Sequence, residues 1–281
     1  MNRSLALEPT DATSAVSAGV QGYSTLSLPL AEAQALRKSI PSWAPADTPG
    51  HFFKYSDEQT IACVQVVDRL IAAEGLDVAD CRDWGILVAP RFIGRLAGAG
   101  IRERFQKRGD QGVSPHTLPQ HSLHSPSGAL SILLGTRGPN VGMGGGPNSL
   151  TEGLLAALTM FDLNAPSSSG AGLWFVATDW SPEPLPDEQG HCTTPAVCHA
   201  IALLLRPAST AGLLGHLTLQ LGNEANVAQQ RSAHGTRIDQ LIQALERDNP
   251  GNGPLGFEWY LPWTGRLEMH LSAANTACEA A

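Results

Sequence analysis

Residues Leu133–Ala157 read LLGTRGPNVGMGGGPNSLTEGLLAA, a stretch with three parts. In residues 133–141, a glycine and a Gly-Pro pair interrupt any helix and predict a short strand. Residues 142–147 hold four glycines and a proline, which predict a tight turn. A polar start at Asn148, an acidic Glu152 and leucines at helical spacing then predict a helix. Backbone amides converge where a strand, a glycine turn and a helix start meet, and chemistry is often sited there.

The charge balance excludes nucleic acid as a partner. The 281 residues hold 18 Lys and Arg against 26 Asp and Glu, a net charge of -8. Phosphate binding needs a concentrated basic face, and the chain offers only a small scattered group, Arg102, Arg104, Lys107 and Arg108. We interpret this group as a solvated helix face, with a docking site for an acidic partner as the alternative.

The apolar pattern indicates a protein without a membrane span. No apolar run approaches the roughly 20 residues that a span needs, and no basic region followed by an apolar stretch opens the sequence. We therefore expect a soluble, cytoplasmic protein. Its length suffices for a sizeable core without a disulfide or metal. Five cysteines, an odd number, indicate reduced thiols.

Helical patterns alternate with buried-strand patterns along the chain. Residues 56–73 predict a helix with a serine cap at Ser56 and apolar residues at helical spacing. Residues 84–90 form a continuous apolar run, typical of a strand covered on both faces. We predict an α/β fold with a mixed sheet covered by helices. The other predicted elements are strands at 16–28, 173–178, 196–205 and 214–221, helices at 30–39, 94–107 and 237–247, a loop over 112–127 before a buried segment at 128–134, and a hairpin or strand pair at 257–271.

Three segments of the chain together carry a resemblance to a known family. The first is the helix from Asp57 to Leu70 with the strand Trp84–Pro90. The second is SPHTLPQHSLHSPSGALSILLGTRGPNVGMGGGP, residues Ser114–Pro147, and the third is GLWFVATDW, residues Gly172–Trp180, with the HCTTPAVCHAIALLLRP that follows. These segments resemble the N-terminal half of a β-ketoacyl synthase of the thiolase-like superfamily. The resemblance implies a thiolase-like layered fold with one βαβαβ half.

The family's nucleophile has no counterpart at the glycine turn. In ketosynthases a cysteine at this turn accepts the acyl chain as its activated thiolate. In register with the family, that position is Pro147, with Gly146 as the neighbouring alternative, and neither has a nucleophilic atom. Ser149 is interpreted as a capping group, because no GxSxG elbow surrounds it. Cys192 is distant in sequence, so a covalent acyl-enzyme at this turn is not expected, and no catalytic residue is assigned.

The resemblance ends near Gly222. The family's C-terminal half should need roughly another 150 residues, the size of a domain, whereas 59 residues (281 minus 222) follow here. His234 and His270 lie among them without the glycine-rich or threonine-rich surroundings expected of the family's two active histidines. We therefore divide the chain into a frayed N-terminus (1–14), a ketosynthase-like half domain (15–222) and a C-terminal helix and strand extension (223–281).

A chain that keeps the dimer-forming half and loses the chemistry resembles a chain length factor of the short, aryl polyene type. Such a subunit pairs with an active β-ketoacyl synthase and shapes its acyl tunnel. The candidate dimer strand, within 136–144, holds Arg137, Asn140, Val141 and Met143. The candidate tunnel or partner contacts, from the preceding loop, are His116, Thr117, Leu118 and His121.

The resemblance implies a catalytically silent subunit in polyene pigment, polyketide or fatty acyl biosynthesis. Its partner would be an active ketosynthase in a heterodimer or a second copy in a homodimer, with acyl carrier protein as a further candidate. Half of such a core would also expose an apolar sheet edge, which a partner would cover.

Two other functions stay open. One is a noncovalent acyl-transfer, decarboxylase or hydrolase activity, in which the glycine-turn amides form an oxyanion hole and His116 or His124 is the base. The other is a binding protein for acyl chains or acyl carrier protein.

The sequence predicts neither a cofactor nor a metal. The glycine run lacks the last glycine of GxGxxG and the Lys-Ser/Thr of a P-loop, so no nucleotide cofactor is expected. His116, His121 and His124 are irregularly spaced, without a cysteine or carboxylate nearby, and are interpreted as solvated or structural. The group His191, Cys192, Cys198 and His199 is the more plausible zinc site, but Cys198 begins a buried-strand pattern, where a free cysteine behaves as a small apolar residue.

Overall fold

One mixed sheet organises the structure, a computed structural model that describes residues 16–115, 117–163, 172–184, 187, 195–221, 237–247, 254–261 and 265–272. Within these ranges the strand order is β3-β2-β4-β5-β1-β6-β8-β7. Strand β2 pairs in parallel with β3 and with β4, and all other neighbouring strands are antiparallel. The strands are β1 (Val16–Pro29), β2 (Gly85–Pro90), β3 (Asn140–Gly142), β4 (Leu173–Ser181), β5 (Val197–Pro207), β6 (Gly215–Leu221), β7 (Leu255–Leu261) and β8 (Gly265–Leu271).

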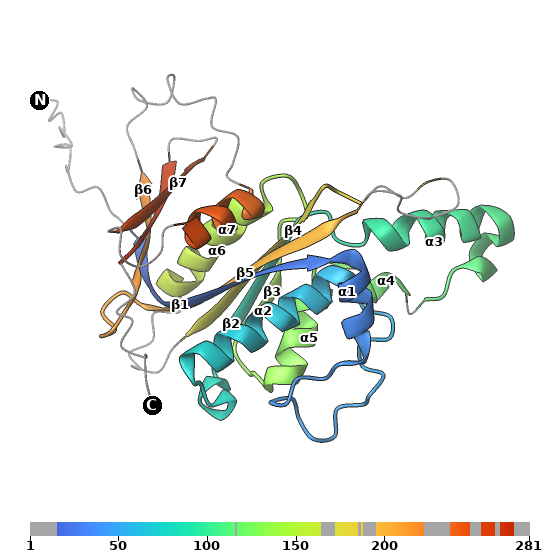
Figure 1. The fold of residues 1–281 in the computed structure, drawn as a ribbon, viewed down its shortest axis with the longest axis horizontal. Helices are drawn as coiled ribbons and strands as arrows, with labels where there is room; N and C mark the ends of the chain where they lie inside the picture. The colour runs from blue at the N-terminus through green and yellow to red at the C-terminus, as the bar shows by residue number, and fades with distance from the viewer. Residues whose placement is uncertain are drawn as a thin grey trace, which may run out of the picture.

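Helices cover both faces of this sheet (Figure 1). On one face, α1 (Leu30–Ala35), α2 (Glu58–Glu74) and α5 (Ser125–Leu134) enclose the first core, and on the other, α6 (Ser149–Leu163) and α7 (Ile238–Arg247) enclose the second. The α/β fold with a mixed sheet is confirmed. The remaining helices are α3 (Arg95–Arg108), α4 (Thr117–Gln120) and the 3-10 turns η1 (Leu36–Lys38), η2 (Val78–Cys81) and η3 (Gly109–Gly112). No helix within the described ranges is long and apolar enough to cross a membrane.

The central strands are apolar on both faces because each face meets a core. All six residues of β2 are buried, and so are the first eight of β4. Along β2, Ile86 and Val88 belong to the core with α2, whereas Leu87 and Ala89 belong to the core with α6. This alternation confirms the strand predicted from the continuous apolar run.

Helix α2 begins one residue later than predicted. Asp57, not Ser56, is the N-cap, and its carboxylate accepts a hydrogen bond from the Gln59 amide at 2.9 Å. The helix ends at Gly75, which has the left-handed φ of 60° that glycine adopts without steric cost. Ser56 is buried just before the cap.

The strand predicted over 133–141 is much shorter than expected. Leu133 and Leu134 are the buried last residues of α5, and the extended backbone begins only at Asn140. Gly135, with a φ of 62°, ends the helix. The sequence identified the helix break at Gly135 correctly, but it assigned Leu133 and Leu134 to the strand, because two leucines suit a buried helix end as well as a strand. The loop predicted over 112–127 likewise contains α4 and the first residues of α5.

The last strands extend the same sheet and curl around the second core. Phe257, Trp259, Leu267 and Met269 of β7 and β8 pack in one cluster with residues of α6 and α7. Figure 1 shows β6 and β7 standing at an angle to β4 and β5, with α6 and α7 between the two parts. The predicted strand pair is thus confirmed as β7 and β8.

The opposite face of these strands carries a polar network. Arg266 donates to Gln220 Oε1 at 2.9 Å, and Gln220 donates in turn to Glu268 Oε2 at 2.9 Å. Tyr260 donates to Glu258 at 2.8 Å. Because side chains alternate along a strand, this end of the sheet is apolar toward the helices and polar on its other side.

Candidate functional site

The glycine turn lies at the carboxyl ends of the parallel strands β2, β3 and β4. Gly144 and Gly145 have φ values of 89° and 87°, which favour glycine. The Met143 amide donates to Val88 O at 3.0 Å, and the Gly145 amide donates to Pro90 O at 3.1 Å. These two amides are therefore engaged by β2 and cannot contribute to the oxyanion hole of the enzyme hypothesis.

The space left by the missing side chains of Gly142 and Gly145 is filled by another segment of the same chain. A Cβ at Gly142 would collide with the Leu123 carbonyl oxygen, and one at Gly145 would lie 2.8 Å from Leu123 Cδ2. The sequence predicted that glycine was needed for close approach. The structure shows that the approaching group is the segment between α4 and α5.

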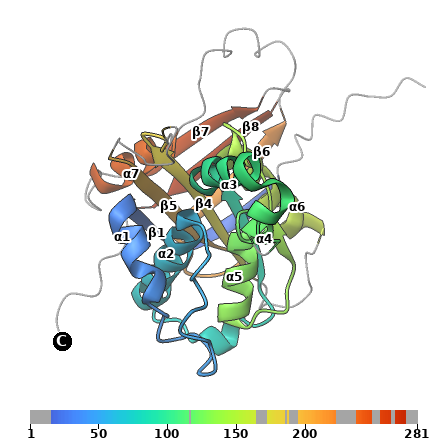
Figure 2. The same ribbon diagram turned by 90° about the vertical axis from the view of Figure 1, so that its right-hand side faces the viewer.

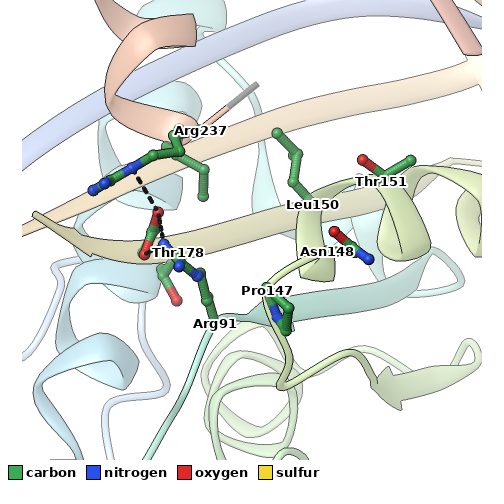
Figure 3. A pocket seen from close by; sticks show the side chains of 9 residues that line it. Arg91, Pro147, Asn148, Leu150, Thr151, Thr178 and Arg237 are labelled. Atoms are coloured by element: carbon green, nitrogen blue, oxygen red, sulfur yellow. Dashed lines mark hydrogen bonds and ion pairs between the residues drawn. The ribbon is translucent and has the colours of Figure 1, made fainter. Parts of the chain in front are cut away.

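Pro147 lines a small pocket beside an ion-pair cluster (Figure 3). The pocket has a volume of about 20 Å³, which is room for about one water molecule. It lies between the start of α6, the end of β4 and the start of α7, and the other lining residues are Arg91, Asn148, Leu150, Thr151, Thr178, Asp179, Arg237 and Ile238. The void is far too small for an acyl chain.

Asp179 is the centre of the ion-pair cluster. Arg91 Nη1 lies 3.0 Å from both of its carboxylate oxygens, and Arg237 Nε lies 3.8 Å from one. The Asp179 side chain is 6% exposed, and its burial raises the pKa of the carboxyl although both arginines oppose the shift. Arg237 also pairs with Asp239 at 3.3 Å, so the start of α7 is tied to the end of β4.

Ser149, the hydroxyl nearest the turn, is buried and engaged. Its hydroxyl donates to the Gly146 carbonyl at 2.5 Å, while the Asn148 carbonyl accepts the Glu152 amide at 2.9 Å. The serine therefore stabilises the turn that leads into α6, but it is the first residue of the helix and donates to a carbonyl, so it is not the capping group that was predicted.

The segment that precedes β3 is held by contacts of two of its histidines, one with Asp57 and one with Ser127. His121 Nδ1 lies 3.4 Å from Asp57 Oδ2, and the Gly94 amide donates to the same oxygen at 3.1 Å. His124 lies within 3.1 Å of the Ser127 hydroxyl. Of the predicted tunnel residues, Thr117 and Leu118 lie on α4, with Leu118 62% exposed. His116 lies outside the described residues.

The remaining candidate residues are dispersed. Asn140 and Val141 lie on β3, while Arg137 and Met143 flank it, and the Arg137 amide donates to Arg82 O at 2.6 Å. His270 lies on β8, 59% exposed and 3.6 Å from Glu268. His234, like the predicted frayed N-terminus, lies outside the described residues.

The cysteines that the structure describes are buried thiols. Burial raises the pKa of Cys63 and Cys198 well above the usual range and that of Cys81 to about 12. His199 Nδ1 lies 2.9 Å from the Ser27 hydroxyl, and His191 and Cys192 lie outside the described residues. Among the residues that the structure describes, no three His, Cys, Asp or Glu side chains are grouped to hold a metal.

Sequence reasoning missed the charged residues beside the turn. Arg91 directly follows β2, Asp179 lies near the end of β4, and Asp57 caps α2. The signal for the first two was available, because polar residues at the carboxyl ends of neighbouring parallel strands meet at one edge of the sheet. Arg237 could not be placed from sequence, since α7 reaches the site only through tertiary packing.

The comparisons with known proteins rest on structure alone, because no family model and no curated protein matches the sequence. A ketosynthase (ApeO) in complex with its chain length factor (ApeC) from Xenorhabdus doucetiae matches with a TM-score of 0.50 and 15% identity, over 90% of this chain and 98% of that chain. The ishigamide ketosynthase/chain length factor matches with a TM-score of 0.52 and 16% identity, over 82% of this chain and 73% of that chain. The fold is ketosynthase-like.

A third match extends this similarity. It is AntDE:AntF, a type II polyketide synthase acyl-carrier protein in complex with its ketosynthase, with a TM-score of 0.57 and 12% identity, over 92% of this chain and 99% of that chain. The predicted ketosynthase-like fold is therefore confirmed. At these identities the likeness concerns the fold, and the chemistry has to be argued from this chain's own residues.

Proposed function

We propose that this protein is a catalytically silent subunit of the chain length factor type, which pairs with an active ketosynthase in polyene pigment, polyketide or fatty acyl biosynthesis. The observation that carries the proposal is that the groups at the glycine turn are either chemically inert or already hydrogen-bonded. Pro147 and Gly146 stand where the ketosynthase-like register places a thiol, Ser149 is bonded to the turn, and the Gly145 amide is bonded to β2. No residue at this turn has a free nucleophilic atom.

The edge of the sheet supports a pairing role. Within the described residues, β3 ends the sheet and pairs only with β2, so its outer edge is unpaired. Helix α5 packs beside β3 and exposes 61% of Ile132. An unpaired strand edge beside an exposed apolar side chain is a template for another chain.

Helix α4 is the element that would act on the partner. The proposed mechanism is steric: His116, Thr117, Leu118 and His121 close the far end of the partner's acyl tunnel and so limit product length. Leu118 is exposed, while the His121–Asp57 contact holds the end of the segment against the body of the protein. An exposed apolar side chain on a fixed backbone suits a role as a wall in a neighbouring cavity.

The mechanism predicts that a larger side chain on α4 shortens the product. Thr117→Trp, reconstituted with the ketosynthase and acyl carrier protein, should shift the product distribution to shorter chains by mass spectrometry. Thr210→Trp, in the β5–β6 connection at the other end of the molecule, is the matched control and should leave it unchanged. Unchanged lengths for Thr117→Trp and for a series of aromatic substitutions at Leu118 would refute the steric mechanism.

Activity assays of the isolated protein and of its mixture with a ketosynthase distinguish this function from the enzyme hypothesis. Turnover of an acyl carrier substrate by this chain alone would favour an enzyme, whereas turnover only after a ketosynthase is added favours the subunit. Size-exclusion chromatography with and without the ketosynthase distinguishes a heterodimer from a homodimer or a self-contained binding protein.

A further inference from the structure

Three neighbouring strands align a hydroxyl, an imidazole and a carboxylate on one face of the sheet. Ser27 of β1 lies directly across from His199 of β5, and His199 lies directly across from Asp179 of β4. Because side chains alternate along a strand, these three lie on the opposite face from their neighbours in sequence. Those neighbours belong to the first core and are Leu28, Cys198 and Trp180.

Ser27 and His199 are joined by a hydrogen bond. Ser27 Oγ lies 2.9 Å from His199 Nδ1. A neutral imidazole with its proton on Nε2 accepts the serine hydroxyl at Nδ1. This is the arrangement in which a general base takes the proton of a nucleophile. Ser27 is exposed, so its oxygen can be reached from solvent.

The surroundings of His199 suit a base. Burial lowers the pKa of His199, although the charges of Asp239 and Asp179 oppose this shift. The imidazole is therefore neutral and able to accept a proton near pH 7. Once His199 has accepted the proton, the two aspartates and Glu246 stabilise the imidazolium, whereas Arg237 disfavours it.

The two aspartates are fixed by hydrogen bonds of their own. Asp179 accepts the Trp180 amide at 2.7 Å, and Asp239 accepts the Ser181 hydroxyl at 3.1 Å. Helix α7, which carries Asp239, contacts β1, β4 and β5, and it lies beside β5 in Figure 1 and Figure 2. The charges around His199 therefore come from a strand and a helix, which hold their positions while a reaction proceeds.

We propose that Ser27 and His199 form a nucleophile–base pair that hydrolyses esters with a good leaving group. Ser27 Oγ attacks the acyl carbon while its proton passes to His199 Nδ1, and the bond to the leaving oxygen breaks. The leaving group takes the proton from His199. Water then attacks the acyl-serine, and its proton passes through His199 to Ser27 Oγ, which releases the carboxylic acid and restores the serine. This activity is independent of the glycine turn, to which the proposed function applies.

The exposure of Ser27 limits the substrate class. Water solvates the negative charge that develops on the carbonyl oxygen at an exposed position, and it does so less effectively than preorganised donors in an enclosed site. The substrate must therefore supply part of the driving force through a weakly basic leaving group. Aryl esters of short carboxylic acids meet this requirement and fit an open surface.

The test uses the purified full chain without a ketosynthase. The native protein should hydrolyse p-nitrophenyl acetate, and a fluorophosphonate probe should label Ser27, as located by mass spectrometry of its peptides. Ser27→Ala should lose the label, and Ser27→Ala and His199→Gln should each lower the hydrolysis rate about tenfold or more. The matched control is Ser17→Ala, an exposed serine of the same strand that lies across from Thr218, and it should leave the rate and the label unchanged.

A pH profile distinguishes a base from a structural hydrogen-bond partner. The native kcat/KM should rise with pH through a midpoint below 6.5, because His199 must be neutral to act and burial lowers its pKa. Asp239→Asn removes a charge that favours the imidazolium, so the midpoint should move to still lower pH. A purely structural contact would leave the midpoint where it is in the native protein.

Three results would overturn the proposal: no hydrolysis above that of Ser27→Ala, labelling at another residue in place of Ser27, or a native profile with no limb in this pH range. The Ser27–His199 hydrogen bond would then only join two strands. Size-exclusion chromatography of Ser27→Ala with the ketosynthase measures pairing separately. Loss of pairing by the native chain counts against the proposed function, whereas loss of ester hydrolysis counts against this pair alone.

Discussion

At the scale of single residues, Asp57 connects three segments that are distant in sequence. It is 2% exposed, caps α2 through the Gln59 amide, accepts the Gly94 amide at the base of α3, and lies 3.4 Å from His121 Nδ1 after α4. Asp57 thus ties the base of α3 and the segment after α4 to the core. The neighbouring Gln59 continues the connection, because Thr178 donates to its Oε1 at 2.7 Å and its amide nitrogen donates to Arg91 O at 3.1 Å.

Asp57→Ala is expected to lower the free energy of unfolding by about 2–4 kcal/mol, since it removes a helix cap and leaves the partly buried Gly94 amide without its acceptor. Urea unfolding followed by circular dichroism measures the change. Asp77→Ala is the matched control, because the exposed Asp77 caps only the short turn η2 through Ala79 at 2.9 Å and should cost about 1 kcal/mol or less. Equal effects of the two substitutions would contradict the connecting role of Asp57.

At the scale of elements, β3 and α3 present two separate surfaces with different chemistry. The β3 edge offers unpaired backbone groups and the exposed Ile132 of the adjacent α5. Helix α3, which extends beyond the end of the sheet in Figure 1, exposes 55% of Phe105. The two surfaces can therefore be tested against each other in one set of proteins.

Ile132→Asp is expected to weaken pairing with the ketosynthase by at least about tenfold, because it would place a charge in an apolar contact. The unfolding free energy of the isolated chain should change by less than about 0.5 kcal/mol, since the side chain is exposed. Phe105→Ser on α3 is the matched control and should leave ketosynthase pairing intact. Analytical ultracentrifugation of mixed proteins decides the question, and pairing that survives Ile132→Asp would exclude this face of α5 from the interface.

At the scale of the whole molecule, the sheet closes its second core with its own last strands. Trp259 of β7 is 1% exposed and stacks on Phe257 with ring centres 6.1 Å apart, while Tyr260 beside it faces the polar network. The described residues of α7, β7 and β8 therefore supply part of the core. The sheet is continuous from β3 at one end to β7 at the other.

Trp259→Ala is expected to lower the free energy of unfolding by about 3–5 kcal/mol, because it removes a large buried side chain and leaves a cavity between the sheet and the helices. Tyr260→Ala, one position along the same strand, loses a hydrogen bond at the surface and should cost about 1 kcal/mol. Thermal unfolding of both variants measures the contrast. Similar melting temperatures for the two variants would show that the buried side chain of Trp259 does not stabilise the core.

The sequence by itself determined the local structure of this protein. Continuous apolar runs predicted β2 and β4, the Asn148–Leu158 pattern predicted α6, and the arrangement of segments predicted a ketosynthase-like fold. These features follow from local patterns of burial and turn chemistry, which short stretches of sequence record directly. The absence of a thiol at Pro147 and Gly146 was equally visible.

Only the tertiary structure decided what surrounds the turn and what the chain exposes. Nothing local to Gly142 indicates that Leu123 fills the space beside it, and Arg237 reaches Asp179 from a helix 58 positions later. The apolar and basic residues of α3 read as an ordinary helix until the fold places it beyond the end of the sheet. Such relations depend on which distant segments pack together, and long-range packing follows from the whole core rather than from any one stretch.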